Sequence, residues 1–217
     1  MSDHRPTRFT TERFKAFVDA VVAIAMTLLI LPLLEAVSDA ASGELTTAEF
    51  FHEHAGQLLS FALSFLLIAT FWMGHHSQYR DVEAITGPLL WINVAWMATI
   101  VWLPVPTAML GQIANDPLQA LTYIGTLILT QMTTLAGGIY LQRHPDLSTA
   151  PAASFRSGIV GDLASIILFS AALVIAVTVP HVGYAGLFLL LLGNPLARLL
   201  GRTTRLRTPD EGAGSPE

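Results

Sequence analysis

The chain alternates long apolar stretches with short polar segments. A helix needs about 20 apolar residues to cross a hydrocarbon core of ~30 Å. Six stretches come close to this length, at residues 14–34, 57–74, 88–110, 118–141, 157–179 and 182–200. The pattern predicts an all-α integral membrane domain of six transmembrane helices over residues 1–201. Residues 202–217 are rich in Pro, Gly, Ser and charge, and they predict a disordered cytoplasmic tail.

Composition agrees with this pattern. Hydrophobic residues make up 53% of the 217 residues and charged residues only 12%, with a mean hydropathy of +0.56. Soluble domains carry about 25% charged residues, so the deficit indicates a lipid environment. The chain has no cysteine, which excludes disulfides, thiolate metal sites and a cysteine nucleophile.

The basic residues are confined to one side of the predicted membrane domain. With six spans, all eleven Lys and Arg side chains fall on the side that holds both termini: Arg5, Arg8, Arg13, Lys15, Arg80, Arg143, Arg156, Arg198, Arg202, Arg205 and Arg207. The opposite side has no Lys or Arg but carries Glu35, Asp39, Glu44, Glu49, Glu53 and Asp116. Basic loops remain in the cytoplasm, so both termini are predicted to be cytoplasmic.

The first apolar stretch also begins like a secretory signal peptide. It has a basic start, and the small residues Ala36-Val37-Ser38 follow it. The apolar run is longer than the core of a usual signal peptide, however, and it contains Asp19, which a cleaved segment would not need. We therefore expect a retained membrane helix.

Asp19 is the least expected side chain in these stretches, because a carboxylate at the centre of a membrane helix costs about 2.5–3.5 kcal/mol. His75, His76 and Asn93 are predicted to lie near the same membrane depth. These residues form either a structural polar network that holds the first helix or an ion or proton site. We favour the structural network, because helical geometry turns Asp19 about 140° away from the face that carries Ile24.

Motifs for catalysis and metal binding have little support. No Gly-x-Ser-x-Gly, HExxH or phosphate-loop sequence is present, so we expect no enzyme, no metal centre and no cofactor. Glu49, His52 and Glu53 share one helical face, which favours a solvated acidic surface over a weak divalent-metal site. Asp162 opens the fifth stretch near Arg156, where a capping or interfacial role is expected.

The start of the first stretch carries a recognisable motif. Arg13 opens it, Phe17-Val18-Asp19 closes it, and an Ala-Ile-Ala-Met-Thr-Leu-Leu run follows. This order resembles the signature of the transmembrane-protein-175 family of potassium channels, in which Arg, three residues and Phe-Ser-Asp precede such a run. The similar segments, within residues 10–112, are residues 13–19, 23–29, 71–76 and 90–107. One position departs from the family pattern, because Val18 stands in place of the Ser.

The resemblance implies a homotetramer in which four six-helix subunits surround one pore lined by the first helices. It implies potassium as the permeant ion, lipid and further copies of the chain as partners, no nucleic acid, and a bacterial inner (plasma) membrane. Selectivity would arise without the Thr-Val-Gly-Tyr-Gly filter of ordinary potassium channels, a sequence absent here. The motif is further implied to hold the first helix through a polar network of Arg13, Phe17, Asp19, Trp72, His75, His76 and Asn93.

One face of the first helix carries Ile24, Thr27, Leu28 and Leu31, and Glu35 continues it to the acidic outer vestibule. We call the first four residues the pore face. In a tetramer, a ring of Ile24 would exclude water as a hydrophobic gate, and Leu31 would form a second constriction. A ring of Thr27 would replace part of the hydration shell of potassium. The same spacing occurs in ordinary helix packing, so the resemblance carries this assignment.

A second class of function is a proton- or cation-coupled secondary transporter. It would use Asp19 and the His75/His76 pair as relay groups, and its flux would saturate. The two halves of three helices show no visible internal repeat, which weakens an inverted-repeat transporter.

Overall fold

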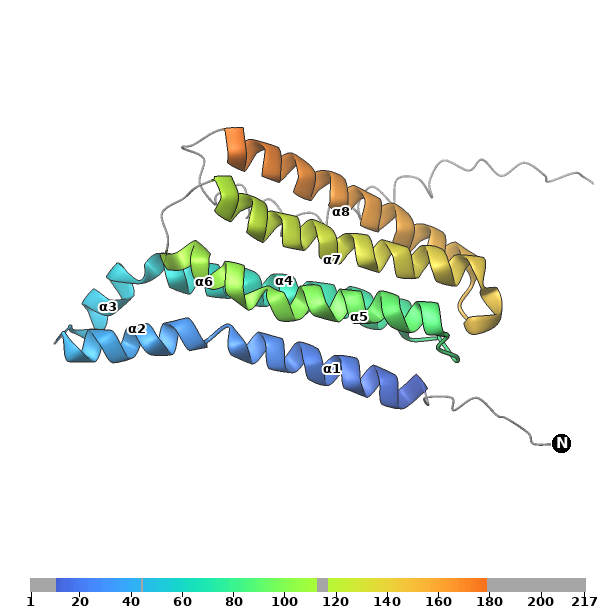
Figure 1. The fold of residues 1–217 in the computed structure, drawn as a ribbon, viewed down its shortest axis with the longest axis horizontal. Coiled ribbons are helices and arrows are strands. Elements are labelled where there is room, and N and C mark those ends of the chain that lie inside the picture. Colours follow the sequence, from blue (N-terminus) through green and yellow to red (C-terminus); the bar gives the residue numbers. More distant parts are fainter. Residues whose placement is uncertain (1–10, 44, 113–116, 179–217) are drawn as a thin grey trace, which may run out of the picture.

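The computed structural model describes residues 11–43, 45–112 and 117–178, and within them the fold is all-α (Figure 1). The elements, in chain order, are α1 (Thr11–Leu28), α2 (Leu31–Ser42), α3 (Thr47–Glu53), α4 (Ala55–Tyr79), α5 (Gly87–Trp102), α6 (Pro104–Gln112), α7 (Pro117–Arg143), the short 3₁₀ helix η1 (Pro145–Leu147) and α8 (Ala152–Thr178). The α-helices other than the short α3 run roughly along the long axis of the molecule, with α2 continuing α1 and α6 continuing α5 end to end.

Five segments of the described chain are long and apolar enough to cross a membrane. They are Thr11–Ser42, Ala55–Tyr79, Gly87–Leu110, Pro117–Arg143 and Ala152–Thr178. They correspond to the first five predicted stretches, so a multi-pass membrane protein is confirmed. The sixth predicted stretch, 182–200, and the predicted tail, 202–217, lie outside the described residues.

Proline interrupts two of these spans. Pro32 has no N–H to donate to the carbonyl of Leu28, four residues earlier, and its ring crowds that carbonyl. The helix accordingly ends at Leu28 and starts again at Leu31, with Ile30 N–H bonded to Thr27 O at 3.3 Å in a tighter turn. Pro104 opens α6 after α5 in a similar way. Figure 1 shows the first break between α1 and α2.

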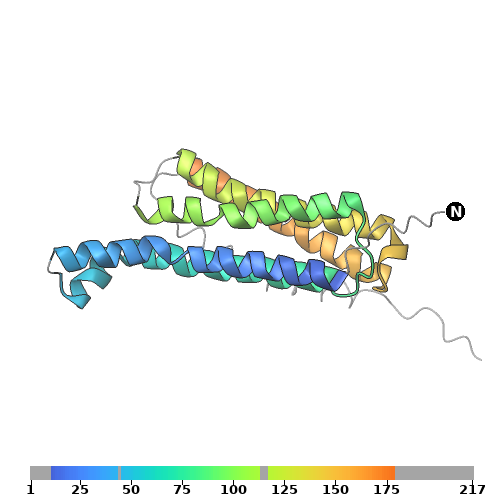
Figure 2. The same cartoon turned by 60° about the horizontal axis from the view of Figure 1, so that its bottom comes forward.

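The core lies between α1, α4, α5 and α7. Helix α1 packs against α4 and α5, α5 packs against α7, and α8 contacts mainly α7 (Figure 2). The buried side chains of α1 are separated by three or four residues, as one face of a helix requires. They are Phe14, Val18, Val22 and Ala25, followed by Leu29 in the turn. Val18 is 1% exposed, so the position where the family carries Ser is filled here by an apolar core side chain.

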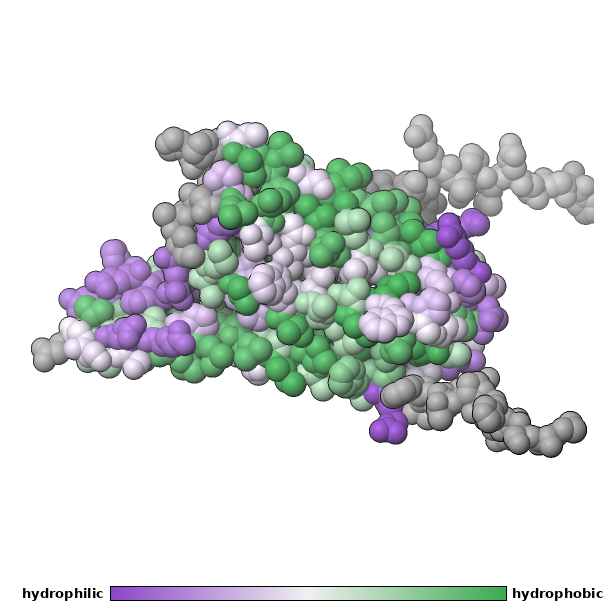
Figure 3. All heavy atoms as spheres, viewed as in Figure 1, coloured by the Kyte–Doolittle hydropathy of each residue, from purple (hydrophilic) through white to green (hydrophobic). Residues whose placement is uncertain are grey.

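On the face that Figure 3 shows, a hydrophobic belt lies between two hydrophilic ends. Large apolar side chains of α1, α5, α7 and α8 are exposed, among them Trp91, Leu129, Val160 and Ile167. An exposed apolar surface of this extent is costly in water and favourable in lipid. The distribution therefore supports a membrane-embedded molecule.

The loops at one end of the bundle are tied to one another and to α1. Lys15 Nζ donates to the carbonyl of Arg80 at 2.9 Å, which joins the start of α1 to the α4–α5 loop. The N–H of Glu83 donates to the carbonyl of Leu147 at 2.9 Å, which joins that loop to the α7–α8 connection. These bonds gather segments that the sequence predicted on one side of the membrane.

At the opposite end, the short helix α3 begins with a capping box. Thr46 Oγ1 accepts from the N–H of Glu49, whose carboxylate accepts from the hydroxyl (2.6 Å) and the N–H (2.8 Å) of Thr46. The hydroxyl bond, and then the backbone bond, hold the pKa of Glu49 below its usual value. Glu49 thus serves as a helix cap. Within the described chain, no three His, Asp or Glu side chains gather to hold a metal ion.

Candidate functional site

The pore face is the exposed side of α1 and the start of α2. Ile24 is 59% exposed, Leu31 48% and Leu28 37%, and Thr27 and Glu35 are exposed as well. The opposite side of the same helix is the buried stripe that begins at Phe14. In the single chain, therefore, the described residues leave the pore face without a packing partner, although it is largely apolar.

The hydroxyl of Thr27 has a defined orientation on this face. Its Oγ1 donates to the carbonyl of Ile24 at 2.7 Å, so its hydrogen is engaged within the helix. The oxygen keeps its lone pairs for another donor or a cation. The carbonyl of Leu28 lies one residue further on and receives no bond from Pro32. The hydroxyl oxygen of Thr27 and the carbonyl oxygen of Leu28 therefore both lie beside the break between α1 and α2.

Asp19 is held by a residue from another helix. Trp72 Nε1 on α4 donates to Asp19 Oδ1 at 2.8 Å. Among the described residues, Phe17 and Arg13 do not join this bond to form a closed network. Phe17 is 58% exposed, and Arg13 is exposed and forms no hydrogen bond or ion pair with the residues that the structure describes. The bond that connects the motif to α4 is that between Asp19 and Trp72.

A second polar cluster joins α4 to α5. His75 Nε2 lies 2.7 Å from Asn93 Oδ1, and Asn93 Nδ2 donates to Tyr79 Oη at 2.9 Å and to the carbonyl of Leu89 at 2.8 Å. Because the amide nitrogen of Asn93 is a donor here, its oxygen is the acceptor and His75 Nε2 carries the proton. The His75 ring is stacked between those of Tyr79 (4.4 Å) and Trp96 (4.1 Å).

The two adjacent histidines have different surroundings. His75 is buried, whereas His76 is exposed and its ring lies 5.7 Å from that of Trp72. In the described part of the chain, no hydrogen bond connects Asp19 with either histidine. The predicted network is thus two local clusters, one at Asp19 and one at Asn93, and its role in holding the first helix remains a prediction.

Sequence reasoning missed a buried chain of hydroxyl groups. Thr107 Oγ1 lies 2.9 Å from Ser64 Oγ, which lies 2.9 Å from Tyr123 Oη. This chain links α6, α4 and α7, and its three residues are at most 4% exposed. The sequence showed only that serine and threonine occur within apolar stretches. It did not show which of them bond, because the bonded pairs are 43 and 59 residues apart.

The prediction for Asp162 is wrong in its location. Helix α8 begins at Ala152, ten residues before Asp162, so this carboxylate lies inside the span and not at its start. It accepts from Gln131 Nε2 on α7 at 2.6 Å. The residues that begin α8 before Gly158 are small, polar and mostly exposed, and only Phe155 among them is buried, in a cluster that includes Leu141 of α7.

Comparison with known proteins identifies the motif. Residues 13–104 match the family described as "Endosomal/lysosomal potassium channel TMEM175". A potassium channel of Streptomyces collinus is 34% identical over 107 residues, which cover 48% of this chain and 49% of that protein. The endosomal/lysosomal proton channel TMEM175 of Mus musculus is 31% identical over 121 residues, 52% of this chain and 23% of that protein. The match spans about half the length of the bacterial relative.

The fold extends the similarity beyond this segment. The crystal structure of a lysosomal potassium-selective channel TMEM175 homolog from Chamaesiphon minutus matches with a TM-score of 0.61 and 21% sequence identity. The match covers 86% of this chain and 97% of that chain. The resemblance found in the sequence is confirmed, and the family is one of ion channels, not of enzymes. Residues 13–104 match the model of the TMEM175 family, and the chain shares the fold of a TMEM175 homologue.

Proposed function

We propose that this chain is the subunit of a potassium-selective channel that conducts passively through a pore lined by the pore face. One observation carries the proposal: an apolar, exposed helix face with one hydroxyl, Thr27, lies within the segment that matches the family. Two bacterial relatives are potassium channels, which supports the choice of ion. The proposed assembly is a homotetramer, since four copies of the face can enclose one axis.

The proposed mechanism follows from the order of side chains along the pore. A narrow ring of Ile24 excludes water, so a passing ion loses much of its hydration shell there, and the ring can gate by dewetting. One turn on, the Thr27 oxygens replace part of that shell. Potassium is more easily dehydrated than sodium, so a partial replacement favours potassium. Leu31 forms a second constriction, and Glu35 at the outer vestibule raises the local cation concentration.

The proposed topology has six spans, with both termini on the cytoplasmic side of a bacterial plasma membrane. It rests on the even number of apolar stretches and on the confinement of all eleven Lys and Arg to one side. Under this topology, the end of the bundle where Lys15 bonds to Arg80 faces the cytoplasm, and the end with α3 faces outward.

Replacing Ile24 or Thr27 by alanine is expected to change ion flux into liposomes that contain the purified protein. Ile24→Ala widens the gate and raises potassium flux several-fold. Thr27→Ala removes one oxygen contact per subunit, worth ~0.5–1.5 kcal/mol, and lowers the potassium-to-sodium flux ratio by roughly 2- to 10-fold. Flux is measured separately for the two ions, with the oligomer size checked by light scattering.

Helix α8 offers matched controls for both variants. Ile167 is 69% exposed, and Thr178 donates its hydroxyl to the carbonyl of Val174 at 2.7 Å, as Thr27 does to Ile24. Ile167→Ala and Thr178→Ala should leave flux and selectivity unchanged. Equal effects in the two pairs, or no passive flux from well-folded protein, would argue against a pore at α1 and favour the coupled transporter.

Substitutions at Asp19 distinguish a structural role of this carboxylate from a role in relaying protons. Asparagine keeps the oxygen that accepts from Trp72 Nε1, whereas leucine removes it. A structural role predicts that Asp19→Asn assembles and conducts within about twofold of wild type, while Asp19→Leu loses the tetramer on size-exclusion chromatography. A transporter that relays protons through Asp19 would instead lose its flux in Asp19→Asn with the assembly intact.

A further inference from the structure

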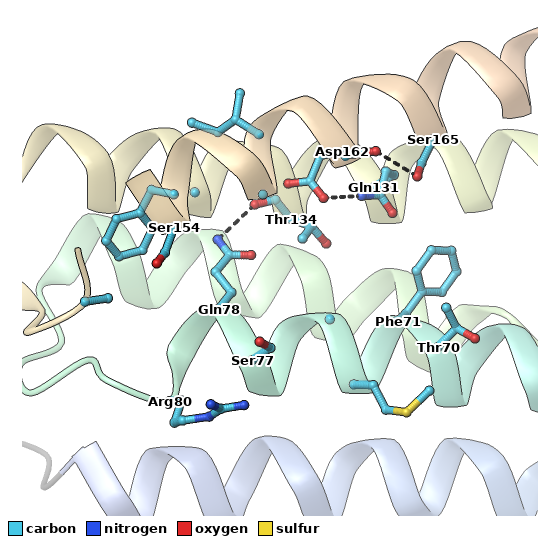
Figure 4. A pocket seen from close by; sticks show the side chains of 18 of the residues that line it. Thr70, Phe71, Ser77, Gln78, Arg80, Gln131, Thr134, Ser154, Asp162 and Ser165 are labelled. Carbon is cyan, nitrogen blue, oxygen red and sulfur yellow. Dashed lines mark hydrogen bonds between the residues drawn. The ribbon is translucent and has the colours of Figure 1, made fainter. Parts of the chain in front are cut away.

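A cleft of about 460 Å³ lies between α4, α7 and α8, away from the pore face. Its lining is unusual for a span, because polar side chains from all three helices face it: Thr70, Ser77, Gln78, Gln131, Thr134, Asp162 and Ser165. Figure 4 shows Gln131 and Asp162 pointing toward each other and Gln78 reaching toward Thr134. Such a surface is poorly solvated by lipid chains, so the cleft suits a polar occupant.

Asp162 is the strongest electrostatic feature of this cleft. It lies about three turns into α8, and its partner Gln131 is near the middle of α7. It is half-buried, and Gln131 Nε2 is its hydrogen-bond donor at 2.6 Å. An ionised carboxylate within a span is costly unless a cation accompanies it, and one neutral amide supplies no charge.

Protein cations do not neutralise Asp162 in the described chain. Just after the end of α4, two charged residues line the cleft, Arg80 and Asp81, and their charges are opposite. Helix α7 contributes the neutral Gln131 and Thr134. On α8, Arg156 is six residues away, so helical geometry turns it about 120° from Asp162. Among the described residues, therefore, the charge of Asp162 is left for a cation from solution to balance.

The neighbours of Asp162 present oxygens to such a cation. Gln131 donates with Nε2, which leaves its Oε1 free to accept. Ser165 donates its hydroxyl hydrogen to the carbonyl of Gly161 at 2.9 Å, so its oxygen keeps lone pairs. Gln78 donates with Nε2 to the carbonyl of Thr134 at 3.1 Å, which also leaves an amide oxygen. One carboxylate among neutral oxygens matches the charge of a monovalent ion, whereas divalent sites in proteins use more carboxylates.

We propose that Asp162 and Gln131 form a binding site for a monovalent cation, separate from the pore face. The ion is an alkali ion held by carboxylate, amide and hydroxyl oxygens with water, or a proton held on the carboxylate itself. The site lies in each subunit, so its occupancy does not require the assembled pore. It is a binding site whether or not the chain conducts potassium.

Infrared difference spectroscopy of the full-length protein in nanodiscs tests this site directly. Potassium or sodium chloride replaces choline chloride at constant ionic strength and pH, and the same preparation is then titrated with acid. We expect alkali ions to shift a carboxylate stretching band. Half-saturation should weaken about tenfold or more in Gln131→Leu, because the amide oxygen that contacts the ion is lost together with the hydrogen bond that orients the carboxylate. The band change should be absent in Asp162→Asn.

Asp81→Asn is the matched control, because Asp81 is an exposed carboxylate that lines the same cleft. It should leave the band change intact. A protonated-carboxyl band that titrates, is lost in Asp162→Asn and is indifferent to alkali ions would assign the proton as the occupant. A signal that survives in Asp162→Asn, or disappears in Asp81→Asn, would overturn the proposal. If Asp162→Asn does not fold, an unchanged half-saturation in Gln131→Leu overturns it equally.

Discussion

Replacing Asn93 by leucine is expected to lower the stability of the protein by roughly 2–5 kcal/mol. The side chain is 1% exposed and makes three hydrogen bonds, to His75, Tyr79 and the carbonyl of Leu89. Leucine is an apolar side chain large enough to avoid a cavity, but it leaves His75 Nε2–H without its acceptor and Tyr79 Oη without its donor. Each buried polar group left without its hydrogen-bond partner costs about 1–3 kcal/mol.

The thermal unfolding midpoint in detergent, followed by tryptophan fluorescence, measures this effect. For a chain of this length the loss corresponds to a fall of roughly 5–15 °C. Trp72→Phe provides a comparison, because it removes a single hydrogen bond, to Asp19, and should cost less. A midpoint for Asn93→Leu within about 2 °C of wild type would contradict the view that Asn93 holds α4 to α5.

Replacing Gly137 by alanine is expected to destabilise the contact between α4 and α7. A Cβ at this position would lie 2.6 Å from Tyr79 Oη and 3.0 Å from Gln78 Nε2. Both atoms are fixed, since Tyr79 accepts from Asn93 and Gln78 donates to Thr134. Overpacking of this kind costs about 1–3 kcal/mol, which exceeds the gain of up to ~1 kcal/mol from the higher helix propensity of alanine.

The same helix supplies the control for this prediction. At Gly125 the nearest atom to an added Cβ is 4.0 Å away, so Gly125→Ala should be neutral or slightly stabilising. Tyr79→Phe removes the clashing oxygen, and the double variant Gly137→Ala with Tyr79→Phe should be more stable than the sum of the single changes predicts. Thermal midpoints of the four proteins form the double-mutant cycle. Strict additivity would show that Tyr79 Oη is not the atom that excludes alanine.

Local patterns determined most of the fold. Five of the six predicted spans are present, because a run of about 20 apolar residues has few alternatives to a membrane helix. The exposure of the pore face agrees with its helical spacing, since Ile24 lies about 160° around the helix from the buried Val22. The 3.6-residue period is a local property of the backbone, and it can be read without knowledge of the neighbours.

The polar clusters depended on packing. His75 and His76 are adjacent in the sequence, and helical geometry points their side chains in different directions. Only the packing of the neighbouring helix determines that His75 is buried and His76 exposed. Asp162 was predicted at a helix start, and its true partner, Gln131, is 31 residues away on another helix. No local pattern indicates which of several buried amides meets which carboxylate.

The order of the five described spans, the two sides of α1 and the family motif were therefore available from the sequence by itself. The tertiary structure alone decided which faces of α4, α5, α7 and α8 touch protein, and so which polar groups meet. The physical reason is the solvent. In water, hydrophobicity marks the buried face of a helix, but in a membrane lipid tails are as apolar as leucine, so both faces of a span carry the same signal.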